Sequence, residues 1–179
     1  MKILRNELKN ELEIRTQKDF PTKGVEFIDI MPLMIQKETF KEIVNKFVEE
    51  IKGKHVEYII SPEARGFIVG SAVANKLGIG FIPVRKQGKL PPKTVEKQFE
   101  YEKEYGKDIL ELPKLVNETY TGKRLYIIDD IYATGNTMKG IKDVIQSLGG
   151  IVVGQGVIMN IKELNQATDI YSLLDINET

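Results

Sequence analysis

The stretch Leu125–Thr137, LYIIDDIYATGNT, constrains the fold more than any other part of the chain. It begins with a short apolar run, residues 125–128, which is typical of a strand buried on both faces. Asp129 and Asp130 follow where such a strand would emerge from a sheet, and successive side chains of a strand point to opposite faces. The small side chains of residues 133–137 then form a turn. The stretch therefore predicts a strand, a turn and a helix, which is the repeating unit of an α/β protein.

The turn and the helix after it predict an anion site. Apolar residues recur at helical spacing from Met138 to Leu148, and Gly149 marks the end of the helix. A phosphate at the start of this helix would meet unpaired amides and the helix dipole, the latter worth about 0.3–1 kcal/mol. The alternative is a plain strand–turn–helix in which the acids only cap the helix. We favour a phosphate site beside a diol site, and the predicted phosphate loop is Ala133, Thr134, Gly135, Asn136 and Thr137.

The remainder of the chain alternates between predicted helices and strands, which indicates a mainly parallel sheet with right-handed crossovers, flanked by helices. Ligands in such sheets bind beyond the carboxyl ends of the strands. One long segment, 86–106, reads as a loop. The predicted helices are 3–13, 38–52 and 67–77, and the further strands are 56–60, 79–84, 151–159 and 170–174.

The composition bounds the class of protein. With 179 residues and no obvious linker, the chain is expected to form a single domain, 1–179. Lys plus Arg and Asp plus Glu are both 26, so net charge gives no support to nucleic-acid or membrane binding. The absence of cysteine excludes disulfides, thiolate catalysis and cysteine metal sites. No apolar run suits a signal peptide or the ~20 residues of a membrane span, so we expect a soluble cytoplasmic protein.

The string DDIYATGNT resembles the phosphoribosyl-pyrophosphate (PRPP) motif of the type I phosphoribosyltransferases. In that family the two acids bind the ribose 2′- and 3′-hydroxyls, and the turn holds the 5′-phosphate. The resemblance thus assigns Asp129 and Asp130 to the ribose. Asn136 departs from the second Gly usual in purine members, but Asn tolerates left-handed backbone better than other non-glycine residues do, so the turn should survive.

Two basic segments are suited to a pyrophosphate. Arg65 lies beside a Gly at a predicted strand-to-helix turn, where its planar fork of donors could bind a phosphate group. EARGF and RKQGKLP also resemble the pyrophosphate-binding segments of the adenine phosphoribosyltransferases, which often have a non-proline cis peptide near the position of Glu63–Ala64. The alternative is that these basic residues simply lie in a solvated loop. Pro62 departs from the residue that more commonly precedes Glu in this segment of the family. The resemblance assigns the pyrophosphate to Ala64, Arg65, Arg85, Lys86 and Lys89.

The segment 86–106 is long and polar, which is typical of an active-site lid or of a disordered connection. Its end, YEKEYG, is similar to a Y-x-L-E-Y-G motif of the same enzymes, and this matches Tyr101, Glu104 and Tyr105. We interpret about 86–106 as a flexible lid. Lys103 replaces an apolar residue of the motif, which leaves the packing of the closed lid open.

The string FPTKGVEF, which ends at Phe27, resembles the family's base-binding segment. The resemblance implies an N-terminal hood, about residues 1–35, in which backbone groups at Glu26 and Ile28 read the adenine edge and Phe27 stacks on the ring. Val25 is assigned to the same site. Phe27 as a plain core residue is the alternative, and Ile28 departs from the basic residue of many relatives.

Four motifs in the family's order, from about residue 14 to residue 174, imply one reaction: adenine and PRPP give AMP and pyrophosphate, as in purine salvage. The family further implies Mg²⁺ held mainly through PRPP, a homodimer, and Glu104 as the acid that assists the base, with Asp129 and Asp130 at the sugar. Two rivals stay open. One is an enzyme for hypoxanthine, guanine or xanthine, whose pocket needs the opposite hydrogen-bond polarity. The other is a non-catalytic PRPP sensor, which normally carries an added DNA-binding module.

Overall fold

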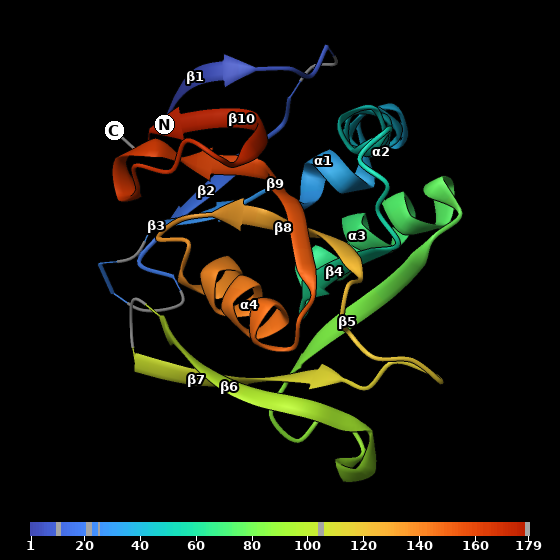
Figure 1. The fold of residues 1–179 in the computed structure, drawn as a ribbon. Helices are drawn as coiled ribbons and strands as arrows, with labels where there is room; N and C mark the ends of the chain where they lie inside the picture. The colour runs from blue at the N-terminus through green and yellow to red at the C-terminus, as the bar shows by residue number, and fades with distance from the viewer. Residues whose placement is uncertain (10–11, 21–22, 25, 104–105, 178–179) are drawn as a thin grey trace.

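In the computed structural model, which describes residues 1–9, 12–20, 23–24, 26–103 and 106–177, an eight-stranded sheet carries three helices on one face and a single helix on the other (Figure 1). The strand order is β1-β10-β9-β8-β4-β5-β7-β6, and a separate two-stranded sheet consists of β2 and β3. The strands of the larger sheet are β1 Lys2–Asn6, β4 Tyr58–Pro62, β5 Gly80–Lys86, β6 Val95–Lys103, β7 Gly106–Pro113, β8 Arg124–Tyr132, β9 Ile151–Ile161 and β10 Tyr171–Asn177. The other elements are β2 Arg15–Lys18, β3 Glu26–Asp29, α1 Met31–Ile35, α2 Lys37–Ile51, α3 Arg65–Leu77, α4 Asn136–Ser147 and the short 3-10 turns Pro92–Thr94 and Lys162–Leu164.

The order of the central strands places a crevice in the middle of the sheet. β4 and β8 are parallel neighbours, but the chain leaves β4 through α3 towards β5 and leaves β8 through α4 towards β9. The two crossovers therefore run in opposite directions, which opens a topological switch point beyond the carboxyl ends of β4 and β8. Figure 1 shows β8 ending on the same side of the molecule as the start of α4 and the strands β2 and β3.

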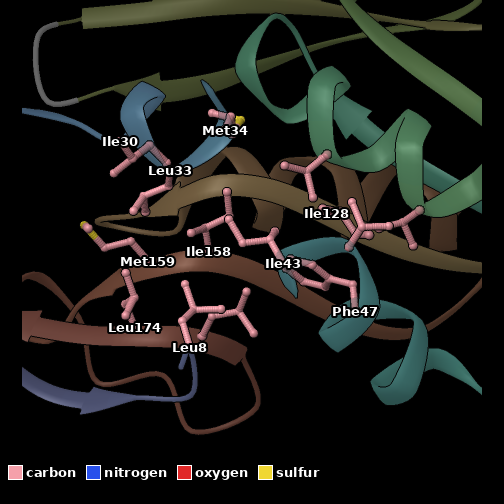
Figure 2. Packing of buried hydrophobic residues seen from close by; sticks show 14 of the residues in the cluster. Leu8, Ile30, Leu33, Met34, Ile43, Phe47, Ile128, Ile158, Met159 and Leu174 are labelled. Atoms are coloured by element: carbon pink, nitrogen blue, oxygen red, sulfur yellow. The ribbon is translucent and has the colours of Figure 1, made fainter. Parts of the chain in front are cut away.

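Each face of the sheet has its own apolar core. On one face, α1, α2 and α3 cover side chains of β8, β9 and β10, and Figure 2 shows Phe47 and Ile43 of α2 packed towards Ile128 and Ile158. On the other face, α4 and β7 enclose a second cluster that includes Ile127. Because β8 contributes to both clusters, its run of apolar residues is buried on both faces, as its sequence predicts.

The predicted mainly parallel α/β sheet is confirmed, but the predicted helix at 3–13 is wrong. The structure has the edge strand β1 there, antiparallel to β10 with Lys2 opposite Asn177. Arg5 holds this strand to its neighbour, since its Nη2 donates to the carbonyl oxygen of Ser172 at 2.6 Å and its Nε lies 3.2 Å from Asp175 Oδ2. Pairing with an open sheet edge thus overrides the weak helical pattern.

The predicted loop at 86–106 is wrong in its second half. β6 and β7 form an antiparallel hairpin that extends the sheet beyond β5, with Gln98 opposite Glu111. β6 lies against α4, where Gly140 leaves room for the ring of Phe99 and the Cβ of Tyr101. The alternation of these rings with charged residues is a strand pattern of period two.

The part of the chain that the structure describes has no helix long and apolar enough to span a membrane.

Candidate active site

The end of β8 and the start of α4 enclose a pocket of about 100 Å³. Gly135 is the residue before the helix and has left-handed backbone, φ +81°, and a Cβ there would overlap the Tyr132 hydroxyl. No side chain among the described residues caps the helix, so the amides of its first turn are open to an anion. Asn136 is the first helical residue, and its substitution for Gly therefore requires no left-handed backbone. The pocket lining includes all five residues of the predicted phosphate loop, Ala133, Thr134, Gly135, Asn136 and Thr137.

Asp129 and Asp130 lie at the carboxyl end of β8, at the switch point. Asp130 is buried, and its backbone N–H donates to Asp129 Oδ1 at 2.8 Å. Gly66 of α3 makes room for the pair, because a Cβ on it would lie 2.8 Å from Asp129 Oδ1 and 3.2 Å from the Ile128 carbonyl oxygen. Burial and the neighbouring Asp130 carboxylate raise the pKa of Asp129 well above its ordinary value, while Arg65 acts against them.

Arg65, the first residue of α3, connects the acids with the base side of the crevice. Its Nε lies 2.6 Å from Asp130 Oδ2 and its guanidinium carbon lies 5.5 Å from the centre of the Phe27 ring. The ion pair lacks hydrogen-bond geometry, since Asp130 Oδ2 is a buried oxygen without a hydrogen-bond partner among the described residues. The peptide Glu63–Ala64 before this helix is cis, as the resemblance implies.

The carboxylate of Glu63 binds the basic segment that begins at the end of β5. Glu63 Oε2 accepts hydrogen bonds from Arg85 Nε and from the Lys86 backbone N–H, both at 3.0 Å. These contacts, chiefly the Lys86 amide, lower the pKa of Glu63 although partial burial acts in the opposite direction. The side chains of Lys86 and Lys89 are exposed. Two predicted pyrophosphate ligands are thus open to solvent, while the Nε of Arg85 is bound to Glu63.

On the base side, β3 pairs with β2 alone among the described strands, so its other edge offers unpaired backbone groups. Ile28 points into the core and is 5% exposed, which is compatible with readout through its backbone. Phe27 is only partly buried and makes an edge contact with Phe20, at 5.2 Å between ring centres. An open strand edge beside a partly exposed ring suits a flat heterocycle with hydrogen-bonding edges.

Three predicted site residues, Val25, Glu104 and Tyr105, lie outside the described residues. Tyr101 is described, and it lies against Gly140 of α4 with its hydroxyl 3.5 Å from Asp108 Oδ2. In this structure Tyr101 therefore supports the hairpin against α4.

Sequence reasoning missed two supporting residues. Asn165, in the segment after β9, donates from Nδ2 to the carbonyl oxygen of Ala133 at 2.8 Å and to Asn160 Oδ1 at 3.0 Å. Glu111 of β7 binds amides of the basic loop. No local motif indicates Asn165, whereas a single acid between Leu110 and Leu112 was a visible signal for Glu111.

Comparison with known proteins agrees with this geometry. Residues 33–175 match the family described as phosphoribosyl transferase domain. The chain is 43% identical over 157 residues to the adenine phosphoribosyltransferase of Brachyspira hyodysenteriae, an alignment that covers 88% of this chain and 90% of that one.

Two solved structures extend the similarity to three dimensions. The adenine phosphoribosyltransferase of Thermoanaerobacter pseudethanolicus superposes with a TM-score of 0.82 at 38% identity, over 91% of this chain and 95% of its own. The Saccharomyces cerevisiae enzyme, solved with adenine and an imino-altritol bisphosphate, has a TM-score of 0.77 at 30% identity, over 90% and 94% of the two chains. A shared fold, an identity of 43% over most of the chain and a pocket built on the same motif lead to one assignment: this chain belongs to the phosphoribosyltransferase family, and within it to the adenine phosphoribosyltransferases.

Proposed function

We propose that this protein transfers the 5-phosphoribosyl group of PRPP to adenine, which gives AMP and pyrophosphate in purine salvage. The observation that carries the proposal is the pair of adjoining sites at the end of β8. One is the pocket formed by the loop 133–137, which presents helix-start amides to an anion. The other is Asp130, whose buried Oδ2 has no hydrogen-bond donor among the described residues and suits a ribose hydroxyl.

The reaction breaks the bond between C1′ and the pyrophosphate oxygen, and the purine N9 forms the new bond to C1′. Positive charge develops on the sugar as negative charge develops on the leaving group. The Asp129–Asp130 pair would orient the ribose hydroxyls and supply negative potential near the sugar. Arg65, Arg85, Lys86 and Lys89 would stabilise the leaving pyrophosphate, more strongly once water is excluded.

Adenine would lie against Phe27, with its edge on the open side of β3, at Val25, Glu26 and Ile28. Glu104 is the proposed acid–base group at the purine N7: as N9 attacks C1′ its carboxylate would accept the proton that the ring loses, and as an acid it would return that proton to N7 when AMP is cleaved in the reverse direction. Such proton transfer is typically worth ~10²–10⁴ in rate. Residues 86–106 would act as the lid, with Tyr101 and Tyr105 in it. The lid would keep water from intercepting the sugar cation.

The described residues fit Mg²⁺ carried by its substrate. They contain no cluster of three or more His, Cys, Asp or Glu side chains that could hold a metal ion. The Asp129–Asp130 pair nevertheless supplies the hard oxygen donors that Mg²⁺ prefers, next to the sugar. When bound to PRPP, the ion would supply Lewis-acid stabilisation of the pyrophosphate.

The proposal includes a homodimer in the cytoplasm, as the family resemblance implies. Sedimentation equilibrium of the purified chain tests the dimer, and a single species with the mass of one chain would contradict it.

The deciding experiment follows AMP formation from adenine and PRPP with and without Mg²⁺, beside hypoxanthine, guanine and xanthine. We expect turnover with adenine that depends on Mg²⁺. Turnover with a 6-oxopurine in place of adenine would favour the first rival enzyme. PRPP binding without release of pyrophosphate would favour the sensor.

A further inference from the structure

Glu111 of β7 is a buried carboxylate that no proposed step of the reaction uses. Its side chain is 3% exposed, although it lies in the outer hairpin of the sheet. A carboxylate so far from water is costly unless donors surround it. Its partners therefore indicate what it does.

Those partners belong mainly to the basic loop 86–90. The Gly88 N–H donates to Glu111 Oε1 at 3.1 Å, and the Leu90 N–H donates to Oε2 at 3.3 Å. Gln98 of β6 completes the set, since its Nε2 donates to Oε1 at 2.8 Å. The Gly88 amide, with help from Gln98 and the amides of Leu90 and Lys89, lowers the pKa of Glu111 against the effect of burial, which keeps the carboxylate ionised.

Other contacts fix the start of the loop, since the Lys86 N–H donates to Glu63 Oε2 at 3.0 Å and the Gln87 N–H donates to the Ile109 carbonyl oxygen at 3.1 Å. Glu111 binds the part beyond them, residues 88–90. Lys89 N–H donates to the Lys86 carbonyl oxygen at 3.1 Å, and Gly88 has φ +76°, which together make a tight turn. A Cβ on Gly88 would meet none of the described residues within 4 Å, so their side chains do not hold the turn there. The two amides bound by Glu111 flank Lys89.

A carboxylate next to an anion-binding loop lowers the positive electrostatic potential of the loop and, by charge alone, weakens anion binding. A structural role of Glu111 that outweighs this effect would explain its presence. We propose that Glu111 is a positioning residue for pyrophosphate binding: it grips the Gly88 and Leu90 amides and thereby aims Lys86 and Lys89 at the leaving group. This inference rests on the proposed function of the loop. It also couples the β6–β7 hairpin, through Gln98, to the same loop.

The test compares Glu111→Gln and Glu111→Asp with the wild-type enzyme, and uses Glu96→Gln on the exposed side of the same hairpin as the matched control. In Glu111→Gln the side-chain NH₂ group faces one of the two backbone N–H donors and cannot accept its hydrogen bond. Glu111→Asp keeps the charge, but its side chain is shorter by one methylene group. Because the loop amides lose a buried acceptor, we expect pyrophosphate affinity and the PRPP KM each to worsen by about tenfold or more. AMP, which lacks the pyrophosphate, should bind all variants with unchanged affinity, and Glu96→Gln should behave as wild type.

A wild-type affinity for pyrophosphate in both Glu111 variants would overturn the proposal, and so would a wild-type affinity in Glu111→Asp alone, because charge rather than position would then suffice. Equal losses of AMP and pyrophosphate binding would also overturn it, as the sign of a general structural defect.

Two further readouts separate this inference from the function on which it rests. Amide hydrogen exchange of the wild-type protein should show Gly88 and Leu90 protected, and trypsin should cut after Lys86 and Lys89 faster in Glu111→Gln. Unprotected amides at Gly88 and Leu90, or unchanged tryptic cleavage in Glu111→Gln, would contradict the contact between Glu111 and the loop, whichever ligand the loop binds. Wild-type pyrophosphate affinity in Lys89→Ala would instead remove the assigned role of the loop.

Discussion

Arg65 and Asp130 form an ion pair across the switch point of the sheet, with 2.6 Å between Arg65 Nε and Asp130 Oδ2. The pair joins the start of α3 to the end of β8, the two segments to which the reaction assigns the pyrophosphate and the ribose. Asp130 Oδ2 nevertheless has no hydrogen-bond donor among the described residues. Arg65 thus balances the charge of Asp130 but donates no hydrogen bond to its Oδ2.

Asp130→Asn tests the role of the Asp130 carboxylate. The amide has the same shape, so the fold should persist, but it replaces a carboxylate that orients the ribose and faces a cationic sugar. We expect kcat to fall by about 10²-fold, the usual effect of losing one preorganised electrostatic group. Steady-state AMP formation measures it. Asp143→Asn on α4, an exposed acid paired with Lys139, is the control, and equal activity of the two variants would contradict the role of Asp130.

Asp129→Asn tests the raised pKa of Asp129. Because the folded state holds this proton more tightly than the unfolded state, the protein binds more protons when folded between the ordinary value of 3.8 and the raised pKa. The contribution of Asp129 to stability therefore falls as pH rises through that interval. Relative to wild type, the variant should gain thermal stability from acid to neutral pH while its turnover falls. Thermal midpoints from pH 3 to pH 8 measure this, and a difference that does not change with pH would refute it.

Gly66→Ala tests the close approach of α3 to the acids. The new Cβ would lie 2.8 Å from Asp129 Oδ1 and 3.2 Å from both the Ile128 carbonyl oxygen and Pro62 Cδ, so backbone must shift. Overpacking of this kind costs about 1–3 kcal/mol, and we expect a loss of that size in unfolding free energy with a larger proportional loss of kcat. Denaturant unfolding and AMP formation measure the two. Wild-type values of both would mean that the contact is not tight.

Asn165→Asp tests the support of the phosphate loop. The substitution places an acceptor against three oxygens, those of Ala133, Asn160 and Ile161, where the amide now donates. A lost buried hydrogen bond costs ~1–3 kcal/mol, so AMP should bind about tenfold more weakly while pyrophosphate binding stays unchanged. Calorimetric titration with each ligand measures this. The exposed neighbour Gln166→Glu makes the same chemical change as a control, and a loss of AMP affinity there too would point to charge alone.

Glu104→Gln tests the proposed acid. The amide cannot exchange a proton with N7, so kcat should fall by ~10²–10⁴ while PRPP affinity changes little. Single-turnover kinetics and PRPP titration separate the two quantities, and an unchanged kcat would remove Glu104 from the mechanism.

The sequence predicts the structure correctly where one short segment contains all the interactions that determine its conformation. Residues 125–137 predict strand, turn and helix locally, and the structure confirms them because burial on both faces, a left-handed Gly and helical periodicity all act within one stretch. The parallel order of β4 and β8 follows from the alternation of elements.

The features that could not be predicted from the sequence depend on contacts between residues that are far apart in the chain. Lys2–Asn6 becomes a strand because β10 offers an open edge 170 residues later. Glu111 and Asn165 lie far in sequence from the loops that they hold, at separations of 23 and 32 residues for their contacts with Gly88 and Ala133. No periodic pattern in the sequence indicates such long-range contacts.

The central claim is that the loop 133–137 and the Asp129–Asp130 pair hold PRPP together. A crystal structure with Mg²⁺ and PRPP tests it most directly. The account predicts the 5′-phosphate on the amides at the start of α4 and the ribose hydroxyls on the two carboxylates. A structure at saturating PRPP with this pocket empty and the sugar bound elsewhere would contradict it.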